Sequence, residues 1–572
     1  MRAGTELNEY RSMMFNKVKL QRFDAEHTDH LPVQVNGAAS SISCPSSHFD
    51  ILSSLRIEEQ STLIMPTVQV LKQVAEPAPQ ADTMGYANQL RTLIKSSGIY
   101  ALASLASPLV SLVLAPFLTR HLSNEDYGAL AVITTAVALL AGLTQLGLGS
   151  AFFRSYSYDY ESRVDRLGVL STVVILLLLI SVPITIATMI AAPWLAILLL
   201  KSSSFTDFVR FGALVVLLQN LTIPGFAWLR AENRAGFFTT LSIINLLVNL
   251  GTTFVLVGVQ HMGGVGSLIG TGSGFAVVIA CTIPLILLHA NLRLRFDIAR
   301  GLLSFGLPNV SNFVSIWVLQ LSDRYLLSFF GSLSQTASYA VAYSLGGILS
   351  VLVLSPFTLA WPSAMFTIAK RDDAPRIFRL VFLWFSIVLL FAAFALSLAS
   401  TIILDVFFPS TYRSAASIIP IIALSTLFYG FYNIFTIGIS IKRKTWFAVV
   451  FTSVSALVNV GLNLVLIPLY GAIGAAISTL LAYAILALMA FTVNQRLYPI
   501  PFETGLFIAL LVIGLGLYLG SNFLGQGLGA YEAWGISFSA LALYSGCLLL
   551  FANLSVQRNK NTSRQAKETF LS

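Results

Sequence analysis

The stretch LVNVGLNLVLIPLYGAIGAAIS at residues 457–478 resembles an earlier stretch of the same chain, LVNLGTTFVLVGVQHMGGVGSLIG at residues 247–270. Asn249 corresponds to Asn459, 210 positions later, and Gly263 corresponds to Gly471, 208 positions later. In both stretches a glycine-containing break separates two long apolar runs. The recurrence indicates that the chain contains a duplicated structural unit.

The composition is typical of a membrane protein. Of 572 residues, 56% are hydrophobic and only 10% are charged, whereas a soluble domain carries about 25% charged residues. Three cysteines, Cys44, Cys281 and Cys547, offer neither a disulfide framework nor the spacing of a metal site. The net charge of +9 does not indicate a nucleic-acid partner, because the basic residues gather in alternate loops between apolar runs.

Long runs without Asp, Glu, Lys or Arg define the expected membrane spans. About 20 apolar residues cross a bilayer as a helix, and a helix satisfies its own backbone hydrogen bonds in lipid. The run 445–495 contains the turn Pro468–Gly471 and therefore counts as two helices. The sequence thus predicts an all-α polytopic membrane protein with about fourteen transmembrane helices. The uncharged runs are 96–119, 127–153, 167–200, 211–229, 235–260, 262–288, 301–322, 325–369, 380–404, 414–441, 445–495, 504–531 and 533–557.

The distribution of Lys and Arg sets the expected orientation. With the N-terminus inside, the inner loops hold 20 Lys and Arg residues and the outer loops hold five. Basic residues are retained on the cytoplasmic side of membrane proteins. Both termini are therefore expected in the cytoplasm, with anionic lipid as the partner of the basic loops.

The repeat extends beyond the opening phrase. LRTLIKSSGIY (90–100) matches ARGLLSFGLPN (299–309), and RAENRAGFF (230–238) matches IKRKTWFAV (441–449). Each copy holds six spans, so we expect two parallel repeats around a central cavity that opens alternately to each side. The predicted segments are a mostly disordered cytoplasmic tail (1–83), which precedes a second candidate start at Met84, the first repeat (90–290), the second repeat (299–495), two extra helices (504–551) and a cytoplasmic C-terminal tail (552–572).

Four segments carry a resemblance to a known family. They are LAPFLTRHLSNEDYGALAV (114–132), LGLGSAFFRSY (146–156), DRYLLSFFGSLSQTASYAVAYSLG (323–346) and NLVLIPLYGAIGAAISTLLAY (463–483). In this order they resemble the polysaccharide transporter branch of the multidrug/oligosaccharidyl-lipid/polysaccharide exporter superfamily, the Wzx-type flippases. The likeness runs from about Leu90 to Tyr498.

The resemblance implies a function. The substrate would be an oligosaccharide repeat unit on an undecaprenyl diphosphate carrier, flipped across the bacterial inner membrane for synthesis of O-antigen, capsule or exopolysaccharide. It implies no cofactor, coupling to a proton or sodium gradient, and polymerase and chain-length proteins of the same pathway as partners.

Charged residues at the outer ends of spans are the first site candidates, because charges within a membrane are costly and usually functional. Asp323 and Arg324 follow the uncharged run 301–322 of the seventh span. We expect a cavity-facing pair in which Asp323 exchanges a proton; the alternative is an ordinary interfacial ion pair. Arg120 ends the first span on the same side, where it would either meet the diphosphate or serve as a loop residue.

Two cations at the inner ends of spans are the next candidates. Arg154 ends the second span and Lys95 begins the first. They could receive the diphosphate at the inner leaflet, since cations, and guanidinium forks above all, bind phosphate oxygens. The alternative is simple anchoring at the membrane surface.

The repeated phrase supplies the remaining candidates. Asn249 and Asn459 each lie four residues from a second asparagine, on one face of a helix, where they would bind sugars or hold helices together. Glycines of the same phrase are expected to allow close helix contact. The partner asparagines are Asn245 and Asn463, and the glycines are Gly263, Gly266, Gly471 and Gly474.

Two other functions compete with this hypothesis. A drug exporter of the sister branch would share the fold but typically has twelve spans. An enzyme acting on the same carrier lipid would need an outer loop rich in acid–base residues, and the outer loops here are short. Within the flippases, lipid II is disfavoured because the first and second spans lack the central arginines of its transporters.

Overall fold

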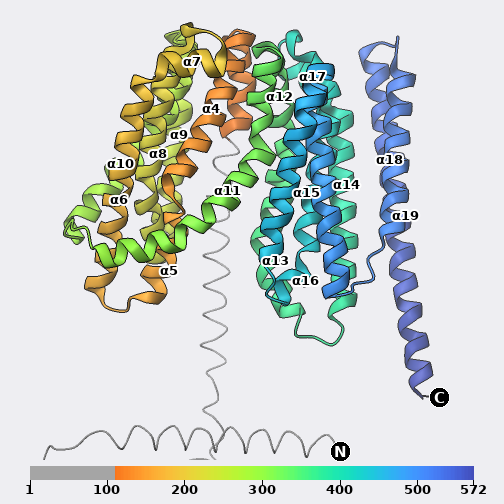
Figure 1. The fold of residues 1–572 in the computed structure, drawn as a ribbon. Coiled ribbons are helices and arrows are strands. Elements are labelled where there is room, and N and C mark those ends of the chain that lie inside the picture. The colour runs from red at the N-terminus through yellow and green to blue at the C-terminus, as the bar shows by residue number, and fades with distance from the viewer. Residues whose placement is uncertain (1–109, 572) are drawn as a thin grey trace, which may run out of the picture. The chain divides into compact units, whose positions relative to one another are not determined.

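The computed structural model describes residues 110–571, which all belong to one compact unit, Met84–Ser572. These residues form helices joined by short loops and contain no β-strand (Figure 1). Residues 110–121 form the described part of the first predicted span. The predicted tail 1–83 and Lys95 lie outside the described residues.

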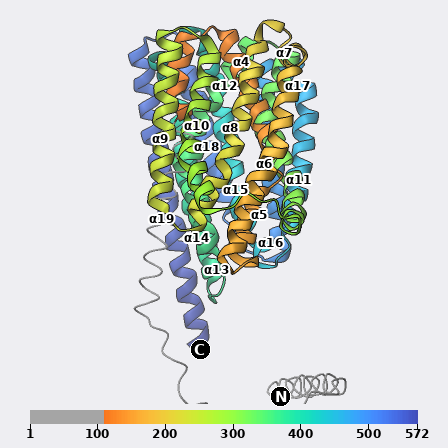
Figure 2. The ribbon, with the colours of Figure 1, turned by 90° about the vertical axis from the view of Figure 1, so that its left-hand side faces the viewer.

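The helices follow one another with few residues between them, and Figures 1 and 2 show the long ones running alongside one another. In chain order they are α4 (Asn124–Gln145), α5 (Leu148–Arg154), η1 (Ser155–Asp159), α6 (Arg163–Ile190), α7 (Ala192–Leu200), η2 (Ser203–Phe205), α8 (Thr206–Ala231), α9 (Ala235–Thr253), η3 (Phe254–Val259), α10 (Gly263–His289), α11 (Phe296–Phe330), α12 (Leu333–Leu349), η4 (Ser350–Leu354), α13 (Ser355–Ile368), α14 (Ala374–Phe407), η5 (Ser410–Ser417), α15 (Ile419–Phe435), α16 (Ile437–Ile441), α17 (Trp446–Leu497), α18 (Thr504–Gly525) and α19 (Ala530–Leu571).

Twelve helical segments of the described chain are long and apolar enough to cross a membrane. The longest of them, α17, has 52 residues and is interrupted at Gly471, where φ is 56° and ψ is −131°. It therefore contains two spans, as the turn at Pro468–Gly471 predicted. Together with the helix at 110–121, this confirms an all-α, multi-pass membrane protein with about fourteen spans.

Local structure recurs at the period of the repeat. Ser123 caps α4 by accepting a hydrogen bond from the Asp126 backbone, and Ser332, 209 positions later, caps α12 in the same way. Asn233 and Arg443, 210 positions apart, both have φ of 55° in the loops that precede α9 and α17. The duplicated sequence thus forms matching helix starts and turns, while the orientation of the two copies about a common axis stays a prediction.

The glycines of the repeat have two different roles. A Cβ atom at Gly474 would lie 2.2 Å from the Leu466 carbonyl oxygen, so the close helix contact there requires glycine. A Cβ atom at Gly266 would lie 3.1 Å from the Leu256 side chain, which would have to shift slightly to make room for it. Gly263 was expected to do the same, but the space beside it is open. Its φ of 63° shows instead that it serves the turn before α10.

Helix α11 connects the two halves. It contacts α4 and α5 of the first half and α12 and α17 of the second, and Figure 1 shows it rising from beneath the first group of helices. Near its start, Gly306 packs against the left-handed turn at Gly147, so closely that a Cβ on Gly306 would lie 2.2 Å from the Leu146 carbonyl oxygen. Pro308 lies inside the same helix. The far end of α11 is thereby placed between the halves, with Asp323 and Arg324 on it.

Candidate functional site

A cavity of about 560 Å³ lies among the helices of the first half and the ends of α11 and α12. Hydroxyl and amide groups form part of its wall beside a larger apolar part, and Arg324 is the one charged residue among the described residues that line it. A membrane-embedded cavity of this character suits a polar, anionic group. The polar lining residues are Ser111, Tyr127, Thr134, Thr135, Ser242, Asn245, Asn249, Ser267, Thr271, Arg324 and Ser344.

Arg324 presents its guanidinium to this cavity from α11. Its side chain is 11% exposed, its Nη1 donates to the Gln320 carbonyl oxygen at 3.1 Å, and its Cζ lies 4.4 Å from the centre of the Tyr343 ring. These contacts hold the group in place and leave donor N–H groups available, because a guanidinium has five. A fixed cation in a buried wall binds an anion more strongly than the same cation in water.

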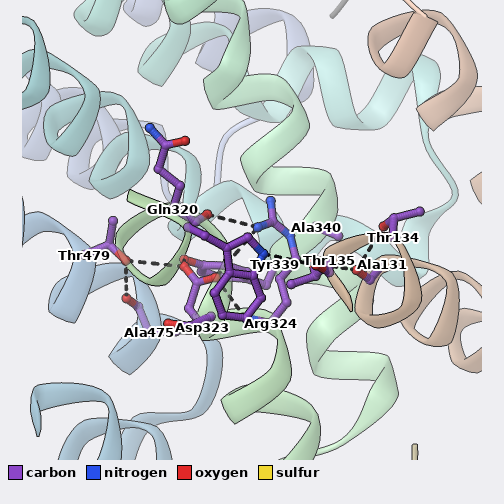
Figure 3. A network of polar contacts seen from close by, with 12 residues as sticks. Ala131, Thr134, Thr135, Gln320, Asp323, Arg324, Tyr339, Ala340, Ala475 and Thr479 are labelled. Carbon is purple, nitrogen blue, oxygen red and sulfur yellow. Dashed lines mark hydrogen bonds and ion pairs between the residues drawn. The ribbon is translucent and has the colours of Figure 1, made fainter. Parts of the chain in front are cut away.

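Asp323 points toward Thr479 of the second half (Figure 3) and is not among the residues that line the cavity. Its side chain is 1% exposed and accepts hydrogen bonds from the Tyr339 hydroxyl, from Thr479 Oγ1 at 3.4 Å and from the Arg324 backbone at 2.8 Å. The Asp323 Oδ1 lies 3.7 Å from Arg324 Nη1. Adjacent residues of one helix thus serve two environments, a buried polar network and an open cavity.

The network continues from Thr479 into the repeated asparagines of α17. Asn459 Nδ2 lies 3.5 Å from Thr479 Oγ1, and Asn463 Nδ2 donates to Asn459 Oδ1 at 3.0 Å. Both asparagines are fully buried, so they hold helices together here rather than line an open site. The Oδ1 atom of Asn463 has no partner within the described chain.

The asparagines of the first half have a different environment. Asn245 and Asn249 both line the cavity, and Asn249 Oδ1 accepts a hydrogen bond from Thr253 at 3.3 Å. Thr253 and Asn249 face Gly270 on α10, where a Cβ would lie 2.1 Å from the Thr253 hydroxyl. Of the two matched asparagines that the sequence proposed, Asn249 reaches the cavity and Asn459 does not.

Two other predicted candidates lie away from the cavity. Arg154 has a half-exposed side chain, pairs with Asp159 at 3.6 Å and lies over the Phe305 ring. Arg120 is exposed and donates to the backbone carbonyls of Val406 at 2.9 Å and Phe407 at 3.2 Å. Arg120 therefore connects the end of the first helix to the end of α14.

Sequence reasoning missed the tyrosines beside the charged pair. Tyr339 binds Asp323, and Tyr343, one turn later, lies under Arg324. Both occur in the segment 323–346, one of the four that carry the family resemblance, and their spacing of four residues places them on one helix face. That spacing was the available signal, but the partner helix was not known from sequence.

Nearly half of the sequence matches a known family. Residues 93–366 match a family model described as "Polysaccharide biosynthesis protein". The resemblance to the polysaccharide transporters is thereby confirmed. A curated relative, the uncharacterized membrane protein MJ1068 of Methanocaldococcus jannaschii, is 27% identical over 220 residues. The match covers 38% of this chain and 43% of that protein, less than half of its length.

Solved transporter structures share the fold. The lipid II flippase MurJ in an inward closed conformation has a TM-score of 0.64 at 17% identity, over 80% of this chain and 99% of that one. An inward-facing multidrug resistance MATE family transporter of the MOP superfamily has a TM-score of 0.54 at 14% identity, over 69% and 94%. At these identities the likeness establishes the architecture but not the substrate, which has to be inferred from the residues of the site.

Proposed function

We propose that this protein flips an oligosaccharide repeat unit, linked to undecaprenyl diphosphate, across the bacterial inner membrane for synthesis of O-antigen, capsule or exopolysaccharide. The observation that carries the proposal is a cavity with hydroxyl and amide groups and a fixed guanidinium in its wall, inside a membrane-spanning, MurJ-like fold. The match to a polysaccharide biosynthesis family supports the same substrate class. Rocking of the two halves would expose the cavity to each side in turn.

The chemistry of the cavity suits the head group of such a lipid. A diphosphate needs cationic donors, and Arg324 supplies them. Sugars need hydroxyl and amide partners, which Asn245, Asn249 and the Ser and Thr residues of the wall provide. The lipid tail needs neither and would remain in the bilayer.

The buried network beside the cavity suits coupling to an ion gradient. Asp323, Thr479 and the unpartnered oxygen of Asn463 are the acceptors that a proton or a sodium ion would use. A cation bound there would neutralise the charge next to Arg324 and so raise the affinity of the cavity for an anion. Transport is coupled when the ion binds the two conformations with different affinity.

The remaining features of the proposal concern its setting. We place both termini in the cytoplasm, because this orientation puts 20 of the loop Lys and Arg residues inside and five outside. The protein would act as a transporter and not as an enzyme, and would hand its cargo to polymerase and chain-length proteins of the same pathway.

A multidrug exporter is the second candidate, since a MATE transporter shares the fold. Export of cationic drugs would require the cavity to attract cations, whereas Arg324 repels them. The family match over residues 93–366 also favours polysaccharide export.

Reconstituted transport tests the proposal. The purified protein is placed in liposomes containing fluorescent undecaprenyl diphosphate that carries N-acetylglucosamine, and a membrane-impermeant quencher reports the leaflet in which the probe lies. We expect flipping of the probe and no transport of ethidium, a cationic dye. Transport of ethidium without flipping of the lipid would establish the drug exporter instead.

Two arginine variants assign the activity to the cavity. Arg324→Gln removes the lining cation and should reduce flipping to the level of protein-free liposomes. Arg210→Gln is the matched control, because Arg210 is half-exposed and pairs with Asp207 on the surface. Full flipping by Arg324→Gln would remove this cavity from the pathway.

A further inference from the structure

A second, smaller pocket of about 110 Å³ lies in the second half, between α11, α15 and the two parts of α17. Three tyrosine rings, Tyr429, Tyr432 and Tyr483, form one part of its wall. Asn312 and Gln320, which both carry an amide, line it from α11. Tyr483 is buried, while Tyr429 and Tyr432 are only partly buried, so their rings keep accessible surface.

A chain of neighbouring tyrosine side chains leads from Arg324 to this pocket. Tyr343, which lies under Arg324, neighbours Tyr483. The Tyr483 ring centre lies 5.2 Å from that of Tyr429, which in turn lies 6.1 Å from that of Tyr432 at an angle of 27° between the planes. A sugar ring in the second pocket would thus lie only a few tyrosine side chains away from Arg324.

The two pockets occupy matching places in the two repeats. The small pocket is bounded by α11, α15 and the two parts of α17. The large cavity is bounded, among others, by their counterparts in the first repeat, which are the helix at 110–121, α8, α9 and α10. Their chemistry differs. The large cavity carries hydroxyls and a guanidinium, whereas the small pocket carries rings and amides.

We propose that the pocket of Tyr429, Tyr432 and Tyr483 is a carbohydrate subsite that holds one sugar ring of the lipid-linked glycan. This inference rests on the proposed function. A pyranose ring has an apolar C–H face, which packs on an aromatic ring, and an edge of hydroxyls, which pair with amides such as Asn312 and Gln320. The pocket is too small for more than one ring, so most of the glycan would remain in the large cavity.

Sugar binding explains the amides better than a cation does. An aromatic cage for a cationic ligand would be expected to carry a carboxylate or to lack nearby cations. Here the chain of tyrosines begins at a cation, Arg324. The described lining of the small pocket also contains no acidic residue.

Binding to two probes that differ only in their sugars tests the subsite. The purified full-length protein is titrated with undecaprenyl diphosphate and with the same lipid bearing tri-N-acetylchitotriose. We expect the wild type to bind the sugar-bearing lipid more tightly. Tyr432→Leu should weaken binding of that lipid about three- to tenfold and leave the sugar-free lipid unchanged, whereas Tyr432→Phe keeps the ring and should bind like the wild type.

Control variants separate the subsite from general effects. Tyr531 is 84% exposed, so Tyr531→Leu should change neither affinity. Gln320→Leu removes an amide and keeps the rings, so it should also reduce the preference for the sugar-bearing lipid. This variant provides the test if Tyr432→Leu does not fold.

Each other outcome overturns the subsite. An equal loss for both lipids, or no loss in either variant, would show that these residues only support the helices. If Tyr432→Leu weakened the binding of ethidium, titrated in the same way, and left the binding of both lipids unchanged, the pocket would be a cation site. If the wild type binds neither lipid, the proposed function itself fails, whereas equal binding of both lipids by an active flippase removes the subsite alone.

Discussion

Asn249 and Asn459 occupy matching positions in the two halves, yet their surroundings differ. Asn249 lines a cavity of about 560 Å³, while Asn459 is fully buried and bonded to Asn463 and Thr479. The repeated sequence therefore forms the same helix in both halves, but its asparagine has a different role in each. The backbone is the same in the two copies, and the residues that face each asparagine from other helices determine its role.

The facing residue on the first helix of each repeat accounts for the difference. Asp323 lies in the second half beside Thr479, and the residue 209 positions earlier is Leu114, which lines the cavity of the first half. A carboxylate draws hydroxyl groups and amides into a closed network, because a buried charge must be satisfied. Leucine has no charge or hydrogen-bonding group to satisfy, so the polar groups of the first half remain available to a ligand.

The largest effect is expected from removing that carboxylate. Asp323→Asn keeps the size of the side chain and removes its charge, so the network can no longer take up a cation. We expect stimulation of flipping by an imposed proton or sodium gradient to disappear completely, measured in the liposome assay. Asp207→Asn, at an exposed carboxylate of the first half, should keep the full stimulation. Gradient-driven flipping by Asp323→Asn would show that coupling lies elsewhere.

A comparison of the two asparagines gives the next effect. Asn459→Ala leaves buried partners without hydrogen bonds and should lower the free energy of unfolding by about 1–3 kcal/mol. Asn249→Ala should lower it less, because the cavity can supply water, but should reduce flipping more per folded molecule. Thermal unfolding in detergent and the flipping assay measure the two quantities. The reverse order in both would refute the assignment of roles.

The paired glycines sharpen the comparison at the level of packing. Gly474→Ala would bring a Cβ atom to 2.2 Å from a backbone oxygen and should destabilise the protein by about 1–3 kcal/mol. Gly266→Ala, with its nearest atom at 3.1 Å, should cost less. Gly461→Ala has open space and should be neutral or stabilising by up to about 1 kcal/mol. Equal unfolding temperatures for all three would mean that the halves pack with the same tolerance.

Much of the fold could be predicted from the sequence, because its determinants are local. Apolar runs define the spans, and the turn at Gly471 divides the longest of them. Serines 209 positions apart cap matching helices. Each of these signals acts within a few residues, so a single sequence is enough to find them.

The site could be predicted only in part, because it depends on contacts between distant segments. The sequence placed Asp323 and Arg324 at the end of a span but could not show that they face opposite environments. It treated Asn249 and Asn459 alike, although only the first reaches the cavity. Tyr339 belongs to the site through its bond to Asp323, which required the packing of α12 on α11.

The smallest effect is expected at the surface of the second half, between α13 and α14. Arg371 donates to Asp373 at 2.8 and 3.1 Å, and this contact lowers the pKa of the Asp373 carboxyl below its usual value. A carboxyl whose pKa is lower in the folded state contributes stability above its unfolded pKa of about 3.9 and loses it as the pH falls through the folded value. The unfolding temperatures of the wild type and Asp373→Asn should therefore differ slightly at pH 7 and converge at acid pH, with equal flipping at pH 7. A reduction of flipping in Asp373→Asn at pH 7 would show that this surface loop, and not only the space between the halves, takes part in transport.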